Sequence, residues 1–346
     1  MQKPGSTRPT MVILRALALG DFLTALPALR ALRTHFPYHE VYLTSARWLT
    51  SLIRFTGVVD HFIDSAIVPS SLDSGMTLWV PEDPRERIPL EKAQLNGLVG
   101  APAEPDIAVN LRGVREELHR VLLALHPHRL IAFHNDAVQE TSSGPCWHSE
   151  EHEVDRWCRL LLESGIQADP YDLRISVPDS HVPEIARGAT LIHPGAGSDA
   201  RCWPPERWAA VARWEVQRGS SVLLTGGPHE VNLALKVAEI AGLSEECVLA
   251  GRTDPLQLAA VMQTAKLLIC SDTGLVHLAV AVKTPSVALF GPTSPSRWGP
   301  PKHLKCHRVL WAGMEGEPYA EKPDQGLLLI SVEEVIEAIR GLEGVN

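Results

Sequence analysis

The segment from Leu267 to Thr293 constrains the fold most, because it contains two apolar strands that each end in a polar turn. The first, Leu267 to Cys270, leads into Ser-Asp-Thr-Gly and an apolar helical run, and the second, Val287 to Phe290, leads into Gly-Pro-Thr. A strand, a helix and a second strand in this order predict a parallel pair. Parallel strands end at the same edge of a sheet, where helix N-termini present unpaired N–H groups to anions. We therefore predict an α/β fold that binds an anionic ligand at this edge.

Length and composition favour a two-domain intracellular protein. A chain of 346 residues exceeds the usual size of one hydrophobic core. Its net charge of -9 argues against a general nucleic-acid-binding protein, which needs a basic face. The sequence has neither an apolar run of about 18 residues nor the apolar core of a signal peptide near its start, so we expect a cytoplasmic protein. Its six cysteines form no CxxC pair and it has no HExxH motif, so no metal site is predicted.

Both halves of the chain alternate strands with helices, which predicts two Rossmann-like domains facing each other across a cleft. We assign residues 1–181 to the first domain and residues 188–346 to the second, with a Pro- and Asp-rich passage leading from one to the other. A final amphipathic helix, Val332 to Leu342, could cap either domain. The strands predicted up to this boundary are Met11 to Leu17, Glu40 to Leu43, His61 to Ile63, Thr77 to Val80, Ile107 to Asn110, Arg129 to Phe133 and Leu173 to Val177.

Gly20 and Asp21 stand between the first predicted strand and a helix with Leu23, Leu26 and Leu29 on one face. Asp21 has two interpretations. It can cap the helix, because a carboxylate accepts hydrogen bonds from first-turn N–H groups. It can also face the ligand site and take a proton from an acceptor hydroxyl as a general base. On position alone, both interpretations stay open.

Gly-rich turns follow two further strands of the second half, at His193 to Ser198 and at Thr225 to Pro228. Glycine allows a ligand to approach the backbone closely. Arg201, just after the first of these turns, offers a guanidinium that can clamp a phosphate. In the third turn, Asp272 can cap the helix that carries His277. Three such turns at one sheet edge favour a ligand site over simple chain reversal.

With these positions identified, the chain resembles glycosyltransferase family 9, the ADP-heptose:lipopolysaccharide heptosyltransferase family. The matching pieces occur in the family's order and are Gly20 to Leu23 with Pro27 and the Leu29 to Pro37 stretch, His193 to Gly197 with Trp203-Pro204, Thr225 to Gly227, and Asp272 through His277 to Thr293. The resemblance implies a GT-B fold whose N-terminal domain binds the acceptor and whose C-terminal domain binds the nucleotide-sugar donor. It also implies transfer with inversion and without a metal or other cofactor.

The same resemblance implies residue roles. Asp21 becomes the general base, and Gly20, Thr24 and Arg112 are assigned to the acceptor side. The backbone N–H groups after Asp272, together with Thr293 and Arg201, would stabilise the leaving diphosphate. The donor-binding residues are assigned as His193, Gly195, Ala196, Gly197, Arg201, Thr225, Gly226, Gly227, Gln257, Asp272, Thr273, Gly274, His277 and Thr293.

Two positions depart from the family pattern. Arg201 stands where family members usually carry a lysine two residues before the Trp-Pro pair, so a planar fork replaces a point charge. Gln257 lies in the stretch where the bacterial lipopolysaccharide enzymes carry a glutamate that holds the ribose. The expected partners are therefore an NDP-sugar, with ADP-heptose first, and a saccharide, lipopolysaccharide-core or small-metabolite acceptor. No nucleic acid and at most peripheral membrane contact are expected.

Two alternatives share the expected architecture. A non-hydrolysing NDP-sugar epimerase needs several acid and base groups around the sugar, whereas Asp21 is the only obvious carboxylate at the predicted cleft of the first domain. A non-catalytic sugar-nucleotide-binding protein would keep the Gly-rich turns and would not need Asp21. Replacement of Asp21 separates these alternatives from a transferase, because a transferase would lose turnover and still bind nucleotide.

Overall fold

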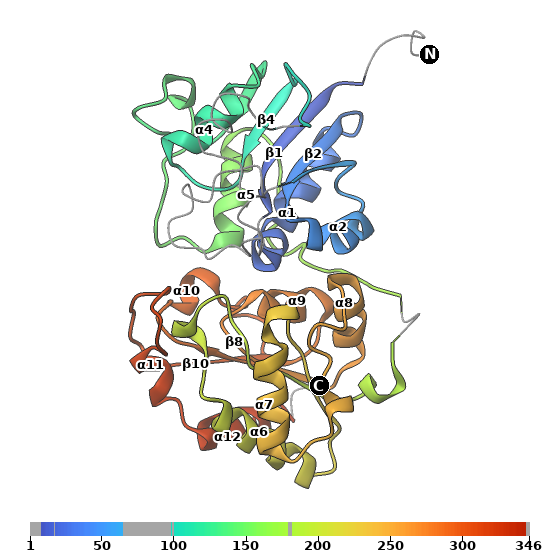
Figure 1. Cartoon of the computed structure of the whole chain (residues 1–346). Helices are drawn as coiled ribbons and strands as arrows, with labels where there is room; N and C mark the ends of the chain where they lie inside the picture. Colours follow the sequence, from blue (N-terminus) through green and yellow to red (C-terminus); the bar gives the residue numbers. More distant parts are fainter. Residues whose placement is uncertain (1–7, 17, 65–97, 99, 179–181, 344–346) are drawn as a thin grey trace, which may run out of the picture. The chain divides into compact units, whose positions relative to one another are not determined.

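The fold is described from a computed structural model, which describes residues 8–16, 18–64, 98, 100–178 and 182–343 (Figure 1). The chain divides into two compact units, with the boundary after Leu173. This boundary lies within the Pro- and Asp-rich passage, residues 168–187, that we expected to lead from one domain to the other. Each unit contains one five-stranded sheet whose paired strands are all parallel.

The N-terminal unit has the strand order β3-β2-β1-β4-β5, with β1 in the centre (Figure 1). Its strands are β1 (Thr10–Ala16), β2 (Glu40–Ser45), β3 (His61–Asp64), β4 (Ile107–Asn110) and β5 (Arg129–Ile131). Its helices are α1 (Leu19–His35), α2 (Thr50–Thr56), α4 (Glu116–Leu123) and α5 (Glu153–Glu163). The predicted strand from Thr77 to Val80 lies outside the described residues.

Helix α1 follows the central strand and is buried along most of its length. It packs against α5, whose Trp157, Leu160 and Leu161 are fully buried. On the other face of the sheet, Val12, Leu14 and Ala108 pack with α4. A helix that is apolar on all sides must lie between other elements, because exposing it would lose the free energy gained by burying apolar surface. The beginning of α1 is therefore fixed at the carboxyl end of β1.

The C-terminal unit has the strand order β10-β9-β8-β6-β7 (Figure 1). Its strands are β6 (Thr190–His193), β7 (Val222–Leu224), β8 (Leu267–Ser271), β9 (Ser286–Phe290) and β10 (His307–Trp311). Its helices are α6 (Pro205–Gln217), α7 (Val231–Ala241), α8 (Pro255–Thr264), α9 (Gly274–Val282), α10 (Pro295–Trp298), α11 (Gln325–Leu329) and α12 (Val332–Arg340).

Helices cover both faces of the second sheet. Alternate strand residues such as Ile192, Ile269 and Leu289 form one core with residues of α6, α7 and α12. Helix α9 contacts β8 and β9 and packs against α8. The last helix, α12, contributes Val335 and Ile339 to the core of the C-terminal unit. It therefore caps the C-terminal domain and not the N-terminal one.

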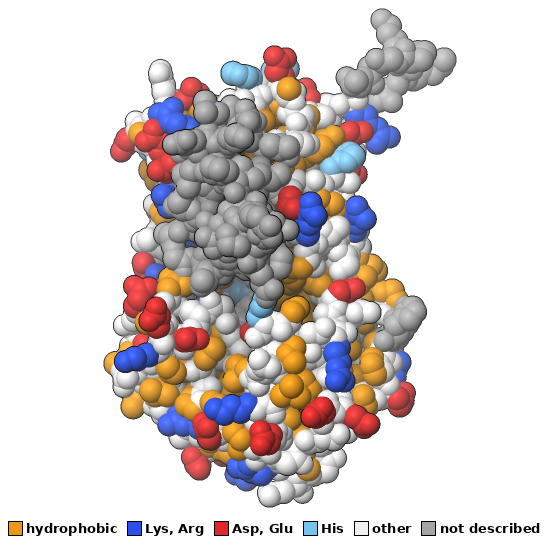
Figure 2. Space-filling view, in the orientation of Figure 1, with side chains coloured by type: hydrophobic (Ala, Val, Ile, Leu, Met, Phe, Trp, Pro, Cys, Tyr) orange, Lys and Arg blue, Asp and Glu red, His pale blue; other side chains and the backbone are white. Residues whose placement is uncertain are grey.

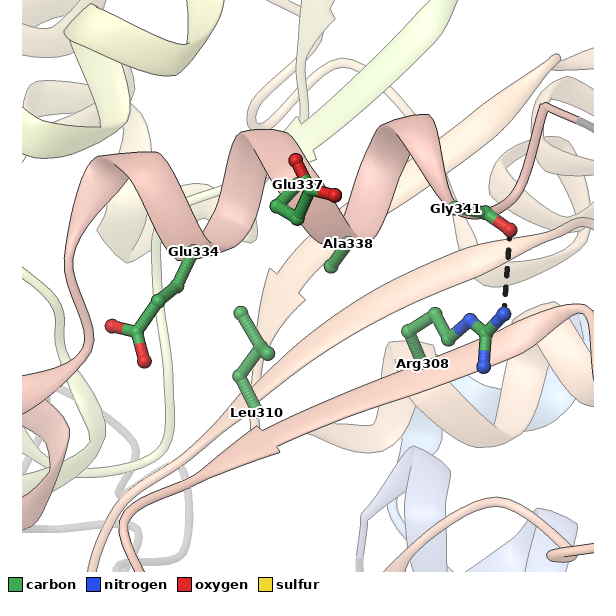
Figure 3. A pocket seen from close by; sticks show the side chains of 6 residues that line it. All are labelled: Arg308, Leu310, Glu334, Glu337, Ala338 and Gly341. Carbon is green, nitrogen blue, oxygen red and sulfur yellow. Dashed lines mark hydrogen bonds between the residues drawn. The ribbon is translucent and has the colours of Figure 1, made fainter.

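A shallow groove separates α12 from the edge strand β10 (Figure 3). Its walls carry Arg308 and Leu310 on the strand and Glu334, Glu337 and Ala338 on the helix. The Arg308 Nη2 donates to the carbonyl of Gly341 at 3.3 Å and holds the end of the helix against the strand. The groove contains none of the predicted donor-binding residues, so it is separate from the candidate site.

The prediction of a strand at Leu173 to Val177 is wrong. In the structure this segment runs along helices instead of joining a sheet. The Ile175 amide donates to the carbonyl of Ala281 at the end of α9, at 2.8 Å. The Val177 amide donates to the Gln263 side chain on α8, also at 2.8 Å. These partners satisfy the backbone without a neighbouring strand, and the alternating apolar residues pack onto helices.

Acidic and basic side chains are mixed over the described part of the face that Figure 2 shows. Many of the described acidic and basic side chains form ion pairs, such as Lys236 with Glu206 at 3.9 Å between α7 and α6. Exposed pairs of this kind contribute about 0–1 kcal/mol each to stability. They indicate a surface adapted to water and not to a polyanion, in agreement with the negative net charge.

We expect Leu289→Ala to lower the free energy of unfolding of the C-terminal unit by about 2–5 kcal/mol, because it removes buried apolar volume from the centre of the sheet. Leu289 has no exposed surface, whereas Leu329 is 66% exposed. Leu329→Ala is therefore the matched control and should change the free energy by less than about 0.5 kcal/mol. Urea unfolding followed by fluorescence and circular dichroism measures both, and equal effects of the two changes would contradict the assigned core.

Candidate functional site

The second sheet brings three of the predicted turns to one edge. In the strand register, His193 lies beside Cys270, and Ser271 lies beside Leu289. The turns that begin at residues 194, 272 and 291 therefore follow neighbouring parallel strands. The turn at Thr225 follows β7, on the other side of β6. This is the carboxyl edge of the sheet, where ligands bind in open α/β folds.

Arg201 connects two of these turns. Its Nη1 donates to the carbonyl of Asp272 at 3.3 Å, and its Nε donates to Ser198 Oγ at 3.4 Å. A side chain at Gly197 would place its Cβ 3.0 Å from Arg201 Nη2, so glycine leaves the room that the guanidinium occupies. Both recorded acceptors are uncharged atoms, so the hydrogen bonds orient the cation and do not neutralise it. An anion at this edge would meet that charge.

Helix α9 begins at the same place. Its N-cap is Thr273, whose hydroxyl accepts from the Leu275 amide at 3.1 Å. The expectation that Asp272 caps this helix is therefore wrong, because the chain turns into the helix one residue later. Asp272 is buried instead, and burial raises its pKa to about 6, although the nearby Arg201 lowers it. Gly274 is the first residue of α9, so the helix N-terminus with its partial positive charge lies beside Arg201.

Glu230 is a site residue that the sequence analysis missed. Its Oε2 accepts from the Gly227 amide at 2.6 Å and lies 3.7 Å from His193 Nε2. The other oxygen, Oε1, lies so close to Gly195 that a Cβ there would be 1.9 Å away. The signal in the sequence was a glutamate three residues after Gly227, the spacing of a capping box. Glu230 places a carboxylate among the Gly-rich turns.

His193 is buried between the two Gly-rich turns. Its Nδ1 lies 3.2 Å from Thr225 Oγ1. Burial lowers the pKa of His193, and the carboxylate of Glu230 opposes that effect. A neutral imidazole fits these surroundings, since one ring nitrogen faces a hydroxyl and the other faces the carboxylate side. His193 therefore links the first turn to Glu230.

The other predicted donor residues differ in their surroundings. Gln257 is exposed, and its Oε1 accepts from the Asp254 amide at 2.9 Å within the capping box that begins α8. His277 lies half-buried on α9, with its ring 6.1 Å from that of Trp298. Thr293 and Ala196 are half-buried in their turns, and Gly226 lies against Glu230 and Ala250. Gln257 thus takes part in the cap of α8, and its assignment to the donor stays a prediction.

In the N-terminal unit, Asp21 occupies the third position of α1 and not the N-cap, which is Ala18. Its Oδ2 accepts from the Ala18 amide at 3.0 Å, so the carboxylate does bind a backbone group at the helix start. Asp21 is 4% exposed. The second interpretation, a general base, is compatible with this contact because only one of the two oxygens is used.

Arg15 is the second residue that the sequence analysis missed. It lies on β1, is 3% exposed, and its Nη2 approaches Asp21 Oδ1 to 3.6 Å. The same Nη2 donates to Thr24 Oγ1 at 2.9 Å. Thr24 is 1% exposed and its hydroxyl also donates to the Gly20 carbonyl at 2.8 Å, so it contacts the site through Arg15. An arginine inside an apolar strand was the signal, because a buried charge requires a partner.

Arg112 lies at the same sheet edge as Asp21. Leu14 of β1 is paired with Asn110, the last residue of β4, and the Arg112 amide donates to the Asn110 side chain at 2.9 Å. Two of the predicted acceptor residues, Gly20 and Arg112, therefore follow the neighbouring strands β1 and β4. The structure brings them to one edge of the N-terminal sheet.

Among the residues that the structure describes, no cluster of three or more His, Cys, Asp or Glu side chains could hold a metal ion. Within the same residues, no helix is both long enough and apolar enough to cross a membrane.

Comparison with known proteins identifies the family. The family model of Glycosyltransferase family 9 (heptosyltransferase) matches residues 147–324. Lipooligosaccharide heptosyltransferase 2 of Haemophilus influenzae is 35% identical over 322 residues, which cover 86% of this chain and 87% of that protein. The chain belongs to glycosyltransferase family 9. The family prediction from the sequence motifs is thereby confirmed.

Other relatives match over a shorter stretch. Lipopolysaccharide heptosyltransferase 3 of Escherichia coli is 30% identical over 151 residues, which cover 43% of this chain and 44% of that protein. A second heptosyltransferase 3, from strain K12, is 29% identical and is covered over 59% of its length. The chain therefore spans only about half the length of some of the curated family 9 relatives that it matches.

Solved structures confirm the GT-B fold. A glycosyl transferase family 9 structure from Veillonella parvula has a TM-score of 0.71 at 21% identity, over 96% of this chain and 97% of that one. ADP-heptose lps heptosyltransferase II of E. coli has a TM-score of 0.70 at 20% identity, over 96% and 98%. The glycosyltransferase TibC of E. coli, described as iron-containing and dodecameric, has a TM-score of 0.58 at 13% identity, over 98% and 77%.

The buried carboxyl of Asp272 makes stability depend on pH. Its pKa rises from an ordinary value of 3.8 to about 6, so folding favours the protonated form. This contribution is complete below pH 4 and is lost as the pH rises through 6. We expect Asp272→Asn to stabilise the protein by about 1–3 kcal/mol at pH 8 and by almost nothing at pH 4, measured by thermal unfolding across that range.

Asp199→Asn is the control for this measurement, because it removes a carboxylate from an exposed position of the same unit. The control accounts for the change in net charge. If Asp272→Asn destabilised the protein equally at pH 4 and pH 8, the carboxylate would be making a required contact and the burial argument would be wrong.

Proposed function

We propose that the protein is an inverting, metal-independent glycosyltransferase that moves heptose from ADP-heptose to an acceptor hydroxyl or amine. The observation that carries this proposal is the convergence of Arg201, the N-terminus of α9 and the Gly-rich turns at one edge of the second sheet. In a family 9 chain, that edge supplies the chemistry that a diphosphate requires. The curated relatives are named as heptosyltransferases, which favours heptose as the sugar.

The C-terminal unit is the proposed donor domain. The N–H groups at the start of α9 and the guanidinium of Arg201 would hold the diphosphate and stabilise the charge that develops on it as it leaves. Thr293, in the turn after β9, would add a hydroxyl donor. Because Glu230 would repel a phosphate, it fits the hydroxyl-bearing part of the donor, where its free oxygen can accept hydrogen bonds. Fixed dipoles and a cation can take the place of a metal in this reaction.

The N-terminal unit is the proposed acceptor domain, with Asp21 as the general base and Gly20 and Arg112 beside it. Asp21 would take the proton of the acceptor hydroxyl while the acceptor oxygen forms its bond to the anomeric carbon. The bond between that carbon and the diphosphate oxygen breaks in the same step, and its electron pair leaves with ADP. One displacement at the anomeric carbon inverts its configuration. Lipopolysaccharide core is the proposed acceptor, on the strength of the relatives' names.

Asp21→Asn should lower kcat by about 100-fold to 10,000-fold, because the amide cannot accept the proton. The dissociation constant for ADP should change less than about twofold, since the donor turns lie in the other unit. Turnover of ADP-heptose with a heptose-free lipopolysaccharide core preparation and ADP titration calorimetry measure the two quantities. Full turnover by the variant would reject Asp21 as the base, and loss of ADP binding would place it in the donor site.

Arg201→Ala should weaken ADP binding by about 10-fold to 100-fold, as expected for a lost charge-assisted hydrogen bond. The ADP affinity of Arg201→Lys should fall between that of Arg201→Ala and that of the native protein, because lysine keeps the charge and loses the planar fork. Arg213→Ala, which removes an exposed arginine of α6, is the control.

Titrations of the native protein with ADP, UDP, GDP and dTDP, with magnesium and with a chelator, should show preference for ADP in both conditions. Preference for another nucleotide would change the donor, and dependence on magnesium would contradict the metal-independent mechanism.

A further inference from the structure

Arg15 is a buried cation that joins three parts of the N-terminal unit. From β1, its Nε donates to the carbonyl of Asp21 at 2.8 Å. Its Nη2 donates to Thr24 Oγ1 at 2.9 Å, and its Nη1 donates to the carbonyl of Leu111 at 3.0 Å. The guanidinium thus fixes the first turn of α1 against the segment that follows β4. A planar fork can make these three bonds together, and a lysine ammonium cannot make them with the same geometry.

The charge of Arg15 is balanced by two buried carboxylates. Asp21 Oδ1 lies 3.6 Å from its Nη2, and Glu153 Oε1 lies 3.7 Å from its Nη1. The ring of Trp157 lies 4.7 Å from the guanidinium carbon and provides a further favourable contact for a cation. A buried arginine is stable only with such partners. Asp21 and Glu153 therefore share one cation through its two terminal nitrogens.

The two oxygens of Asp21 have different surroundings. Oδ2 is bound by the Ala18 amide at 3.0 Å, whereas Oδ1 faces Arg15 at 3.6 Å, beyond the length of a hydrogen bond. The amide fixes the position of the carboxylate, and the cation acts on Oδ1 through its charge. Oδ1 thereby keeps its capacity to accept a proton from another molecule.

A second buried arginine, Arg156, fixes the position of Glu153. Glu153 Oε2 accepts from Arg156 Nη1 at 2.6 Å, and Arg156 Nη2 donates to the carbonyls of His148, Ser149 and Glu151 at 3.1, 3.1 and 2.7 Å. The series from Asp21 through Arg15 and Glu153 to Arg156 alternates in sign, and each side chain is buried. Because Glu153 is anchored at the start of α5, it sets how much of the charge of Arg15 acts on Asp21.

We propose that Arg15 is a positioning residue for the transfer reaction, which orients Asp21 and places a positive charge beside its Oδ1, and that Glu153 shares this charge. The proposal rests on the proposed role of Asp21 as the base. The charged groups recorded against Asp21 and Arg15 among the described residues are each other and Glu153 of α5, with Arg156 behind Glu153. Arg112 follows β4 at the same sheet edge.

Replacement of Arg15 and replacement of Glu153 should shift the pH dependence of turnover in opposite directions. In Arg15→Gln the ionised carboxylate loses its cation, so the acidic limb of the kcat profile should move up by about 1 pH unit. In Glu153→Gln the cation acts on Asp21 alone, so the limb should move down. Arg15→Lys should keep the position of the limb and lower kcat about 10-fold, because the charge remains and the orientation is lost. Loss of structure alone would lower kcat in all three without opposite shifts.

The experiment measures kcat from pH 5 to pH 9 for the full chain with ADP-heptose and a heptose-free lipopolysaccharide core preparation. The double change Arg15→Gln with Glu153→Gln also removes the buried carboxylate that would otherwise face the new glutamine and keep only Arg156 as its charged partner. ADP affinity, measured by calorimetry, should stay within about twofold in every variant, because the donor turns lie in the C-terminal unit. Because this readout reports on the C-terminal unit, circular dichroism and thermal unfolding of the full chain check that the N-terminal unit of each variant is folded.

A folded Arg15→Gln variant with the native limb and native kcat would overturn the role of Arg15. If Arg15→Gln does not fold, the other two variants decide the same point, because the limb should shift in Glu153→Gln and stay in place in Arg15→Lys. Equal profiles of these two variants would overturn the role of Arg15. Asp21→Asn, measured in parallel, separates the two levels of the argument. If it retains turnover, the base assignment fails and the role of Arg15 fails with it, whereas loss of turnover with unchanged Arg15 variants rejects Arg15 alone.

Discussion

Parallel pairing is the constraint on which the rest of the structure depends. In a parallel sheet every strand ends at the same edge, so segments far apart in sequence meet there without further specification. The pairing of Leu14 with Asn110 brings Asp21 and Arg112 to one edge of the first sheet. The pairing of His193 with Cys270, and of Ser271 with Leu289, does the same for the donor turns. Both candidate sites follow from strand register.

The buried and half-buried charges of the two units have different partners. In the N-terminal unit, Arg15 contacts the carboxylates of Asp21 and Glu153, and Arg156 pairs with Glu153, so two guanidinium groups match two carboxylates within the protein. In the C-terminal unit, Arg201 is oriented by a carbonyl and a hydroxyl, while burial favours the neutral form of Asp272. The second unit therefore presents the guanidinium of Arg201 beside the N-terminus of α9 at its edge, which suits a diphosphate. The first has Oδ1 of Asp21, which no described residue binds by a hydrogen bond and which suits a proton.

Sequence patterns predicted the elements well where apolar runs were bounded by turn residues, as in β4 at Ile107–Asn110 and α7 at Val231–Ala241. They failed at Leu173 to Val177, because an extended segment that packs on helices has the same pattern as a strand. The family motifs identified Asp21 and the glycine turns. They did not identify Arg15 or Glu230, since the partners of these residues are set by tertiary contacts that periodicity does not encode.

The glycines of the donor turns have a physical cause besides access for a ligand. A Cβ at Gly195 would lie 1.9 Å from Glu230 Oε1, and one at Gly197 would lie 3.0 Å from Arg201 Nη2. At Gly226 a Cβ would lie 3.0 Å from the Cβ of Glu230. These positions make room for the protein's own charged side chains, which then face the sheet edge. These three glycines and the two charges therefore form one arrangement, because a side chain at any of the three positions would press on the carboxylate or the guanidinium that gives the edge its chemistry.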